Sequence, residues 1–296
     1  MLETSVIIIN WNRKADAANA IQSVLENQPD STEILLWDNG STDGSRELLT
    51  DRFSDNSRVR LHWHHENAGV CRSRNLAVQL TLGEILVFMD SDSLLETPDG
   101  LTSAAQRLKS DPKTGALNFE ILNGHKRVCW PYSRQIEFWG KREFEITRID
   151  GCGFAIRRDV FISAGGFPEH FGYGAEEHFL ARRCIAEGYR VVYYPQVTVT
   201  HLHVPSGRTS DQFATMMRNH IWMPLELFRL PWALFSALGM LVVYGRDAWR
   251  EKRMRDFWKG LAWAIRDFKL NRRQPMSRKA WRHFRDIIKH DRVARN

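Results

Sequence analysis

The sequence has few cysteines, and they form no recognised site. The four cysteines among its 296 residues (Cys71, Cys129, Cys152 and Cys184) are scattered, with no C-x-x-C pair. This spacing argues against a zinc site and a disulfide framework and favours a reducing compartment. The N-terminus also lacks the basic-then-apolar pattern of a signal peptide. We therefore expect the main globular part of the chain to stay in the cytoplasm.

Long apolar runs and glycine-rich phosphate loops are missing as well. The longest uncharged stretch near the C-terminus, residues 230–244, has 15 residues, which is short of the roughly 20 that a membrane-spanning helix needs. No G-x-x-x-x-G-K-[ST] sequence occurs, and no G-x-G-x-x-G follows the first apolar segment. These absences disfavour P-loop and NAD-binding proteins.

Charge is distributed unevenly. The net charge is +7, but residues 246–296 contain 17 Lys/Arg against 6 Asp/Glu, an excess of +11. Residues 1–245 therefore carry −4. A mildly acidic body with a basic tail could bind nucleic acid or an anionic membrane surface, or the tail could serve solubility alone.

The first 90 residues alternate between strand and helix patterns. Apolar runs at 5–9, 33–37 and 85–89 and an alternating apolar–polar pattern at 58–63 predict strands, and residues between them have apolar positions at helix spacing. This alternation predicts an α/β fold with a Rossmann-like, mainly parallel central sheet flanked by helices. Polar loops at 10–12, 38–45 and 90–92 should then meet at one edge of the sheet, where such folds bind ligands.

Two carboxylates, Asp90 and Asp92, follow the buried strand at 85–89. Two acidic groups placed together at a ligand-binding edge suggest a divalent cation that carries a diphosphate. The alternative is a turn, which Asp and Ser also favour. Asp38 has the same ambiguity, because it could bind a base or ribose or serve as a turn former or helix cap.

Several motifs together resemble family 2 glycosyltransferases. They are residues 5–12, Asp38 to Ser45, Glu66-Asn67-Ala68-Gly69 with Arg74-Asn75, and Asp90-Ser91-Asp92, in that order. The resemblance covers about residues 4–207. It implies a GT-A fold, a nucleotide-sugar donor (UDP-, GDP- or dTDP-linked), Mg²⁺ or Mn²⁺, and inversion at the anomeric carbon. It also implies a donor-binding half at 1–95 and an acceptor-binding half at 96–207.

The resemblance also implies roles for individual residues. Asp92 is the expected metal ligand, Asp90 lies near both metal and ribose, and His201 is a third ligand or only a hydrogen-bonded residue. The remaining expected donor-binding residues are Trp11, Asn12, Asp38, Asn67, Gly69, Arg74 and Ser91.

A later acidic pair, Glu176-Glu177, resembles the family's Glu-Asp motif, in which the Asp is the general base. Glu177 stands at that position and is one methylene longer. The alternatives are that Glu176 is the base or that both are structural acids at a helix start. The aromatic-rich residues 123–149 correspond to the family's acceptor segment, although such aromatics could also simply pack.

No Q-x-x-R-W sequence occurs, which argues against processive polysaccharide synthases. The pattern is similar to rhamnosyl- and related transferases of cell-surface polysaccharide assembly, which implies a glycan or lipid-linked glycan acceptor. One alternative is a catalytically inactive GT-A-fold glycan-binding or scaffold protein, because Glu177 stands where the family has its catalytic Asp. Another is a nucleotidyltransferase, although residues 10–13 lack the glycines that it would need.

Residues 208–296 form a basic, aromatic-rich extension. Six of the 11 tryptophans lie after residue 220, interleaved with Arg and Lys. This pattern is typical of α-helices that lie in a membrane interface, so we expect residues 221–296 to contact an anionic membrane surface peripherally. The alternative is a helical subdomain that packs on the core or on a homodimer partner. Nucleic-acid binding is not expected, since no such module is recognisable.

Overall fold

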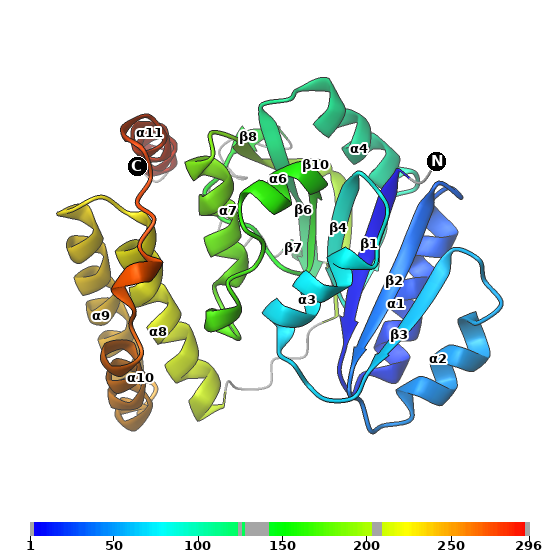
Figure 1. Cartoon of the computed structure of the whole chain (residues 1–296), viewed down its shortest axis with the longest axis horizontal. Helices are drawn as coiled ribbons and strands as arrows, with labels where there is room; N and C mark the ends of the chain where they lie inside the picture. The colour runs from blue at the N-terminus through cyan, green and yellow to red at the C-terminus, as the bar shows by residue number, and fades with distance from the viewer. Residues whose placement is uncertain (1–2, 124–125, 128–141, 203–208, 294–296) are drawn as a thin grey trace.

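The computed structural model describes residues 3–123, 126–127, 142–202 and 209–293. It has a central sheet flanked by helices, and four C-terminal helices lie beside it (Figure 1). The aromatic segment around residues 128–141 and the proposed 207/208 boundary lie outside the described residues, so both remain predictions.

The first half of the sheet is parallel, as the alternation predicted. Its strands lie in the order β3-β2-β1-β4. The elements are β1 (Thr4–Asn10), α1 (Lys14–Asn27), β2 (Thr32–Asn39), α2 (Ser45–Phe53), β3 (Val59–His64), α3 (Val70–Gln79) and β4 (Ile85–Asp90).

The second half extends the same sheet and mixes strand directions. Strand β9 lies between β4 and β6 and is antiparallel to both, which the apolar pattern could not indicate. The elements are β5 (Ser93–Leu95), α4 (Gly100–Ser110), β6 (Thr114–Asn123), β7 (Lys126–Arg127), β8 (Phe144–Glu145), β9 (Gly153–Arg157), α6 (Arg158–Ser163), a 3-10 turn η1 (Glu169–Phe171), α7 (Glu176–Ala186) and β10 (Arg190–His201).

One local prediction was wrong. The sequence pattern indicates two short strands on either side of Pro195, whereas β10 is continuous through it. The register between β10 and β6 shifts between Tyr194 and Thr198. A proline cannot donate a ladder hydrogen bond, and such residues are accommodated where the pairing is irregular.

Apolar residues cover both faces of the sheet. Along β1, Val6 and Ile8 pack into one core cluster and Ile7 into another, because successive side chains point to opposite faces. Helices α1 and α4 contribute to the first cluster, and α3, α6 and α7 to the second. This double burial explains why the strands are continuous apolar runs.

The C-terminal extension consists of α8 (Ser210–Leu227), α9 (Trp232–Arg250), α10 (Met254–Arg266), the 3-10 turn η2 (Leu270–Arg272) and α11 (Arg278–Val293). Helix α8 begins with a capping box between Thr209 and Gln212. Trp222 and Phe284 share a core cluster with Leu180 of α7. The extension is therefore packed on the sheet domain. Across the described ranges, no helix is both long and apolar enough to cross a membrane.

Candidate active site

The polar loops that follow β1, β2 and β4 meet at one edge of the sheet, as expected. In the sheet register Asn10 is opposite Asp38, and Ile9 is opposite Asp90. The Asn10 amide donates to Asp38 Oδ2 at 2.8 Å. The strands are apolar up to these positions, so the polar residues begin where the sheet stops.

The expected nucleotide-binding loops are stabilised by hydrogen bonds to one another. Asp38 Oδ1 accepts from the backbone N–H of Ser41 at 2.8 Å, and Asn12 accepts from that of Thr42 at 2.8 Å. Trp11, which precedes Asn12 in the chain, is 55% exposed. Asp38 is buried and stabilises the loop, which fits its interpretation as a turn former; its contact with a base or ribose stays a prediction.

Asn67 and Gly69 belong to the same edge. Asn67 Oδ1 accepts from the Asn39 amide at 2.8 Å and from the Gly69 backbone N–H at 2.9 Å. Gly69 has φ +80° at the start of α3, a conformation that favours glycine. These bonds fix the position from which α3 begins, and with it Arg74.

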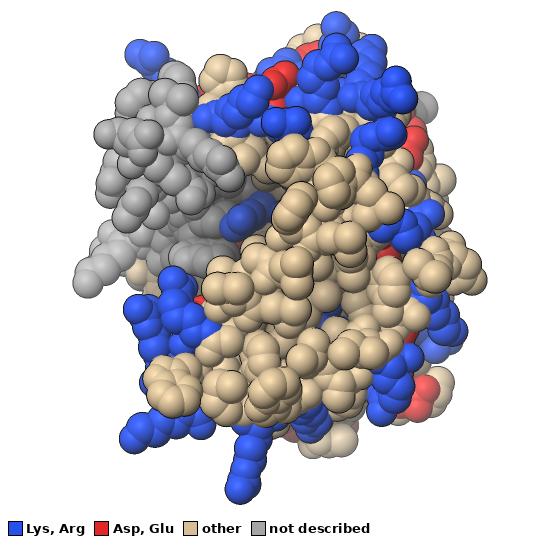
Figure 2. All heavy atoms as spheres, turned by 90° about the vertical axis from the view of Figure 1, so that its left-hand side faces the viewer, with Lys and Arg blue, Asp and Glu red and all other residues tan. Residues whose placement is uncertain are grey.

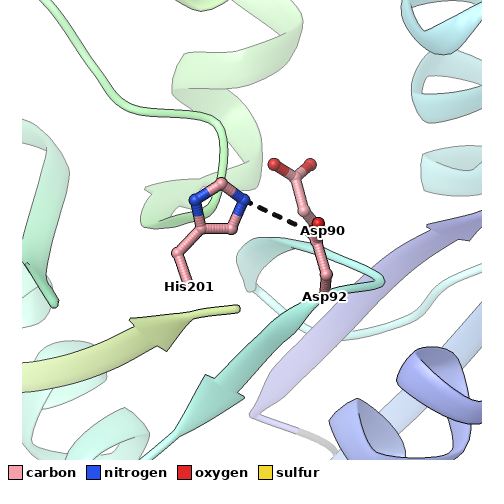
Figure 3. A group of neighbouring side chains, drawn as sticks. All are labelled: Asp90, Asp92 and His201. Carbon is pink, nitrogen blue, oxygen red and sulfur yellow. Dashed lines mark ion pairs between the residues drawn. The ribbon is translucent and has the colours of Figure 1, made fainter. Parts of the chain in front are cut away.

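Asp90, Asp92 and His201 form a compact cluster (Figure 3). One ligand atom from each lies within 4.8 Å of the others. The chain brings them together because β5 pairs antiparallel with β10, which places Ser93 opposite His201. His201 Nε2 lies 3.3 Å from Asp92 Oδ1. Ser91 is buried in the turn between the two aspartates.

The chemistry of this cluster fits a divalent cation. Two carboxylates and an imidazole are donors that Mn²⁺ accepts, and Mg²⁺ prefers the carboxylates. Burial works to raise the pKa of Asp92, but the hydrogen bond and charge of His201 together with the charge of Arg13 outweigh it, so this pKa is lowered. Burial works to lower the pKa of His201, and Asp92 outweighs it in turn. The structure thus pairs an ionised carboxylate with a basic imidazole.

Arg13 also contacts the cluster and was not expected from the sequence. Its Nη1 donates to Asp92 Oδ2 at 2.9 Å. It comes one residue after Asn12 on the β1–α1 loop, so its position on the ligand edge was the signal that could have identified it.

Arg74 connects the cluster to the second acidic pair. It is 2% exposed; its Nη2 donates to Asp90 Oδ1 and its Nη1 to Glu177 Oε1, each at 2.8 Å. Glu176 lies at 4.0 Å. A single buried guanidinium therefore compensates three carboxylates, and its fork geometry suits two of them at once.

The two glutamates differ in environment. Glu176 is 3% exposed, and its Oε2 has no hydrogen-bond partner among the described residues. Burial, reinforced by repulsion from Glu177, raises the pKa of Glu176 well above its usual range. The Glu177 side chain is 15% exposed and held by Arg74. Glu177 is thus the more accessible carboxylate, while Glu176 is the buried one.

A cavity of about 860 Å³ adjoins Asp90 and Glu177. Its walls come from the sheet domain and, unexpectedly, from the extension, through Met216, His220, Tyr244 and Asp247. Gly151 also borders it: a Cβ there would lie 2.2 Å from Glu177 Oε1, so a larger residue at this position would make the Glu177 carboxylate move.

Asp150 is a further acid in this cavity that the sequence did not single out. Its backbone N–H donates to Asn118 Oδ1 at 2.6 Å. Burial raises the pKa of Asp150 to about 7, with repulsion from Glu177 the next cause. No motif contains it, because it adjoins Glu177 only through the fold.

Comparison with known proteins gives this geometry a context. Residues 5–164 match the glycosyl transferase family 2 model. The chain is 23% identical over 218 residues to a glucosyl-dolichyl phosphate glucuronosyltransferase of Haloferax volcanii, covering 68% of this chain and 69% of that protein. It is 27% identical over 225 residues to an O-antigen chain rhamnosyltransferase of Salmonella typhimurium, covering 71% of this chain and 70% of that protein.

The fold is similar to that of a mannosyltransferase from Pyrobaculum calidifontis, solved in complex with GDP-Man and Mn²⁺. The TM-score is 0.63 at 19% identity, over 90% of this chain and 88% of that one. The predicted GT-A fold is thereby confirmed. The chain belongs to glycosyl transferase family 2 and is a glycosyltransferase.

Proposed function

We propose that this enzyme is an inverting, metal-dependent, non-processive glycosyltransferase. It moves a sugar from a UDP-, GDP- or dTDP-linked donor to a glycan or lipid-linked glycan in cell-surface polysaccharide synthesis, on the cytoplasmic side of the membrane. The observation that carries the proposal is the contact of Arg74 with both Asp90 and Glu177. This contact connects the candidate metal cluster to a carboxylate at the mouth of a large cavity.

The donor would lie along the loop edge. Trp11, Asn12 and Asp38 would contact the base and ribose, and Asn67, Gly69 and Ser91 would support the loops. Asp92, His201 and Asp90 would hold Mg²⁺ or Mn²⁺, which neutralises charge on the departing diphosphate when bound. Arg13 would lie next to the same phosphates because it contacts Asp92.

The acceptor would enter the 860 Å³ cavity. Its hydroxyl oxygen attacks the anomeric carbon as the bond to the diphosphate oxygen breaks, and its proton moves to Glu177. The nucleoside diphosphate leaves with the bonding electron pair. Glu176, with its raised pKa, is suited to remain protonated beside Glu177, so we assign the base to Glu177.

The donor and metal assignments can be tested together. The purified full chain is heated with UDP-, GDP- and dTDP-sugars, with and without Mn²⁺, because a ligand that binds only the native state raises the melting temperature. We expect one donor class to raise it further when Mn²⁺ is present. Asp92→Asn should abolish the Mn²⁺-dependent part, whereas Asp51→Asn, on the exposed side of α2, should not.

Turnover decides the catalytic assignments. Glu177→Gln should lower kcat by about 10²–10⁴-fold, the usual contribution of a general base, with the donor-induced melting shift retained. Glu176→Gln should have a smaller effect on kcat. Normal turnover by the chelator-treated enzyme would show that the reaction does not need a metal ion. Glycan binding with no turnover of any nucleotide-sugar would support the inactive scaffold instead.

A further inference from the structure

Helix α9 exposes several large apolar side chains of the kind that a surface helix of a soluble protein normally buries. Its buried positions are the small residues Ala233, Ala237 and Ala248. Several of its large apolar residues point outward, with Phe235 63% exposed, Leu238 58% and Val242 72%, whereas Met240, Leu241 and Tyr244 pack inward. A surface helix of a soluble protein normally buries its large apolar side chains and exposes polar ones.

The outward residues share one face of the helix. Phe235, Leu238, Val242 and Trp249 are separated by three, four and seven residues, which is the spacing of one helix face. On α10, Trp258 and Ile265 are also exposed and seven residues apart. An exposed apolar surface of this extent marks an interaction site. We call the four residues Phe235, Leu238, Val242 and Trp249 the α9 stripe.

Basic side chains border the stripe. Figure 2 shows this side of the molecule, with a broad uncharged area flanked above and below by Lys and Arg and with few acidic residues. Exposed bases in the second half of α9 and in the chain that follows it are Arg246, Arg250, Lys252, Arg255, Arg266 and Lys269.

A basic groove lies near the N-terminal end of α9. It has a volume of about 400 Å³. Among the described residues that line it are Arg229, Arg278, Arg282, Arg285 and Lys289, against one carboxylate, Asp286. Trp232 also lines the groove, with the Arg285 guanidinium 4.8 Å from its ring centre. The groove therefore combines positive charge with an aromatic side chain, which suits an anionic headgroup at an apolar boundary.

We propose that the α9 stripe and the basic groove dock the enzyme on the surface of an anionic lipid bilayer. Helix α9 then lies in the interfacial plane with Phe235, Leu238 and Val242 among the acyl chains, and the flanking bases contact lipid phosphates. Charge complementarity selects this occupant over a second copy of the chain. A symmetric dimer through the stripe would bring the two basic borders against each other, which costs free energy.

Docking can be measured without any glycosyl transfer, so its outcome is independent of the proposed function. The full chain is sedimented with vesicles of phosphatidylcholine alone and of phosphatidylcholine with phosphatidylglycerol. We expect strong binding only to the anionic vesicles, weakened by added salt. The double variant Leu238→Asp/Val242→Asp should lower the affinity at least about ten-fold, because charges enter the apolar interface.

Matched controls separate docking from folding. Leu82→Asp/Ile162→Asp makes the same change at two side chains of the sheet domain that are 67% and 65% exposed, and it should bind vesicles as the wild type does. Arg282→Glu/Arg285→Glu should lose binding to anionic vesicles. All variants should keep the wild-type melting temperature.

Two results would overturn the proposal. One is equal sedimentation of the wild type and the Leu238→Asp/Val242→Asp variant with anionic vesicles. The other is a wild type that does not bind vesicles and is dimeric by size-exclusion chromatography, while the Leu238→Asp/Val242→Asp variant is monomeric. That second result would assign the α9 stripe to an interface between copies.

Discussion

Arg74 is the residue on which the charge balance of the site depends. It is buried and compensates Asp90, Glu177 and, at longer range, Glu176. Its guanidinium also lies 5.1 Å from the ring centre of Phe167. A buried ion pair adds little net stability when intact, but removal of one partner leaves uncompensated charge.

Arg74→Ala should therefore lower the free energy of unfolding by about 3–5 kcal/mol, as measured by urea denaturation. Arg74→Lys should also be impaired, since an ammonium cannot make two parallel forked contacts. Arg72→Ala, a neighbouring exposed arginine on α3, is the control and should change stability little. An Arg74→Ala protein as stable as the wild type would contradict this account.

Asp150 makes stability depend on pH. Its pKa in the folded protein is raised to about 7, above the ordinary value of 3.8. A carboxyl with a raised folded pKa contributes stability that is fully present below the ordinary value and is lost as pH rises through the folded value. Asp150 therefore destabilises the fold increasingly from about pH 4 to about pH 7.

Asp150→Asn removes this dependence. The free energy of unfolding of the variant minus that of the wild type should increase by about 2 kcal/mol from about pH 5 to about pH 8. This figure is reduced for the partial exposure of the Asp150 side chain. Urea denaturation at both pH values measures it. If the free energies of unfolding of the two proteins change with pH in parallel, Asp150 titrates near its ordinary pKa.

Residue positions that depend on strand ends were predictable, and those that depend on long-range packing were not. Asp90 and Asp92 follow an apolar run, so the sequence alone places them at the ligand edge. The family resemblance predicted that His201 lies near these two aspartates, and the pairing of β5 with β10 brings it there. The link from Arg74 to Glu177 spans 103 positions, and no local pattern encodes it. The assigned roles of these residues stay predictions.

At the scale of elements, α8 stabilises the loop that leads into α7. Asn219 of α8 is fully buried, and its amide donates to the carbonyl groups of Phe171, Tyr173 and Gly174 at 3.0, 3.0 and 2.8 Å. These residues immediately precede Glu176 and Glu177. The sequence predicted only a basic, aromatic-rich helical extension over residues 208–296, so this connection between the extension and the acidic pair emerged from the structure.

Asn219→Ala should remove the amide donor to the carbonyl groups of Tyr173 and Gly174, while the Phe171 carbonyl still accepts from Arg218. We expect the free energy of unfolding to fall by about 1–3 kcal/mol and kcat to fall because Glu177 loses its support. Gln212→Ala, at the capping box of the same helix, is the control for a weakened α8. If both variants lose stability equally but only Asn219→Ala loses kcat, the positioning role is supported; equal kcat would refute it.

At the scale of the whole molecule, the extension is part of the folded unit. Trp222, Met223, Leu227 and Phe284 lie in the same core cluster as residues of α7. Composition predicted a basic, aromatic, helical extension but could not show which aromatics face inward. Tryptophan is amphipathic, so Trp222 in the core and Trp249 at the surface have the same sequence signature.

Deletion of residues 210–296 should therefore expose the core of the sheet domain. We expect the truncated chain to aggregate or to melt well below the full chain, because each buried large side chain that is lost costs about 2–5 kcal/mol. Thermal melting and light scattering measure this outcome. A truncated form that melts as the full chain does would mean that the sheet domain folds independently.

The shared wall of the large cavity has a kinetic consequence. Ser236, Met240 and Tyr244 line the cavity from the inner side of α9, whose outer side carries the apolar stripe. An enzyme docked through that stripe would meet lipid-linked acceptors by lateral diffusion. Its rate would then follow the mole fraction of acceptor in the membrane, and dilution with inert lipid would slow it at constant bulk acceptor concentration.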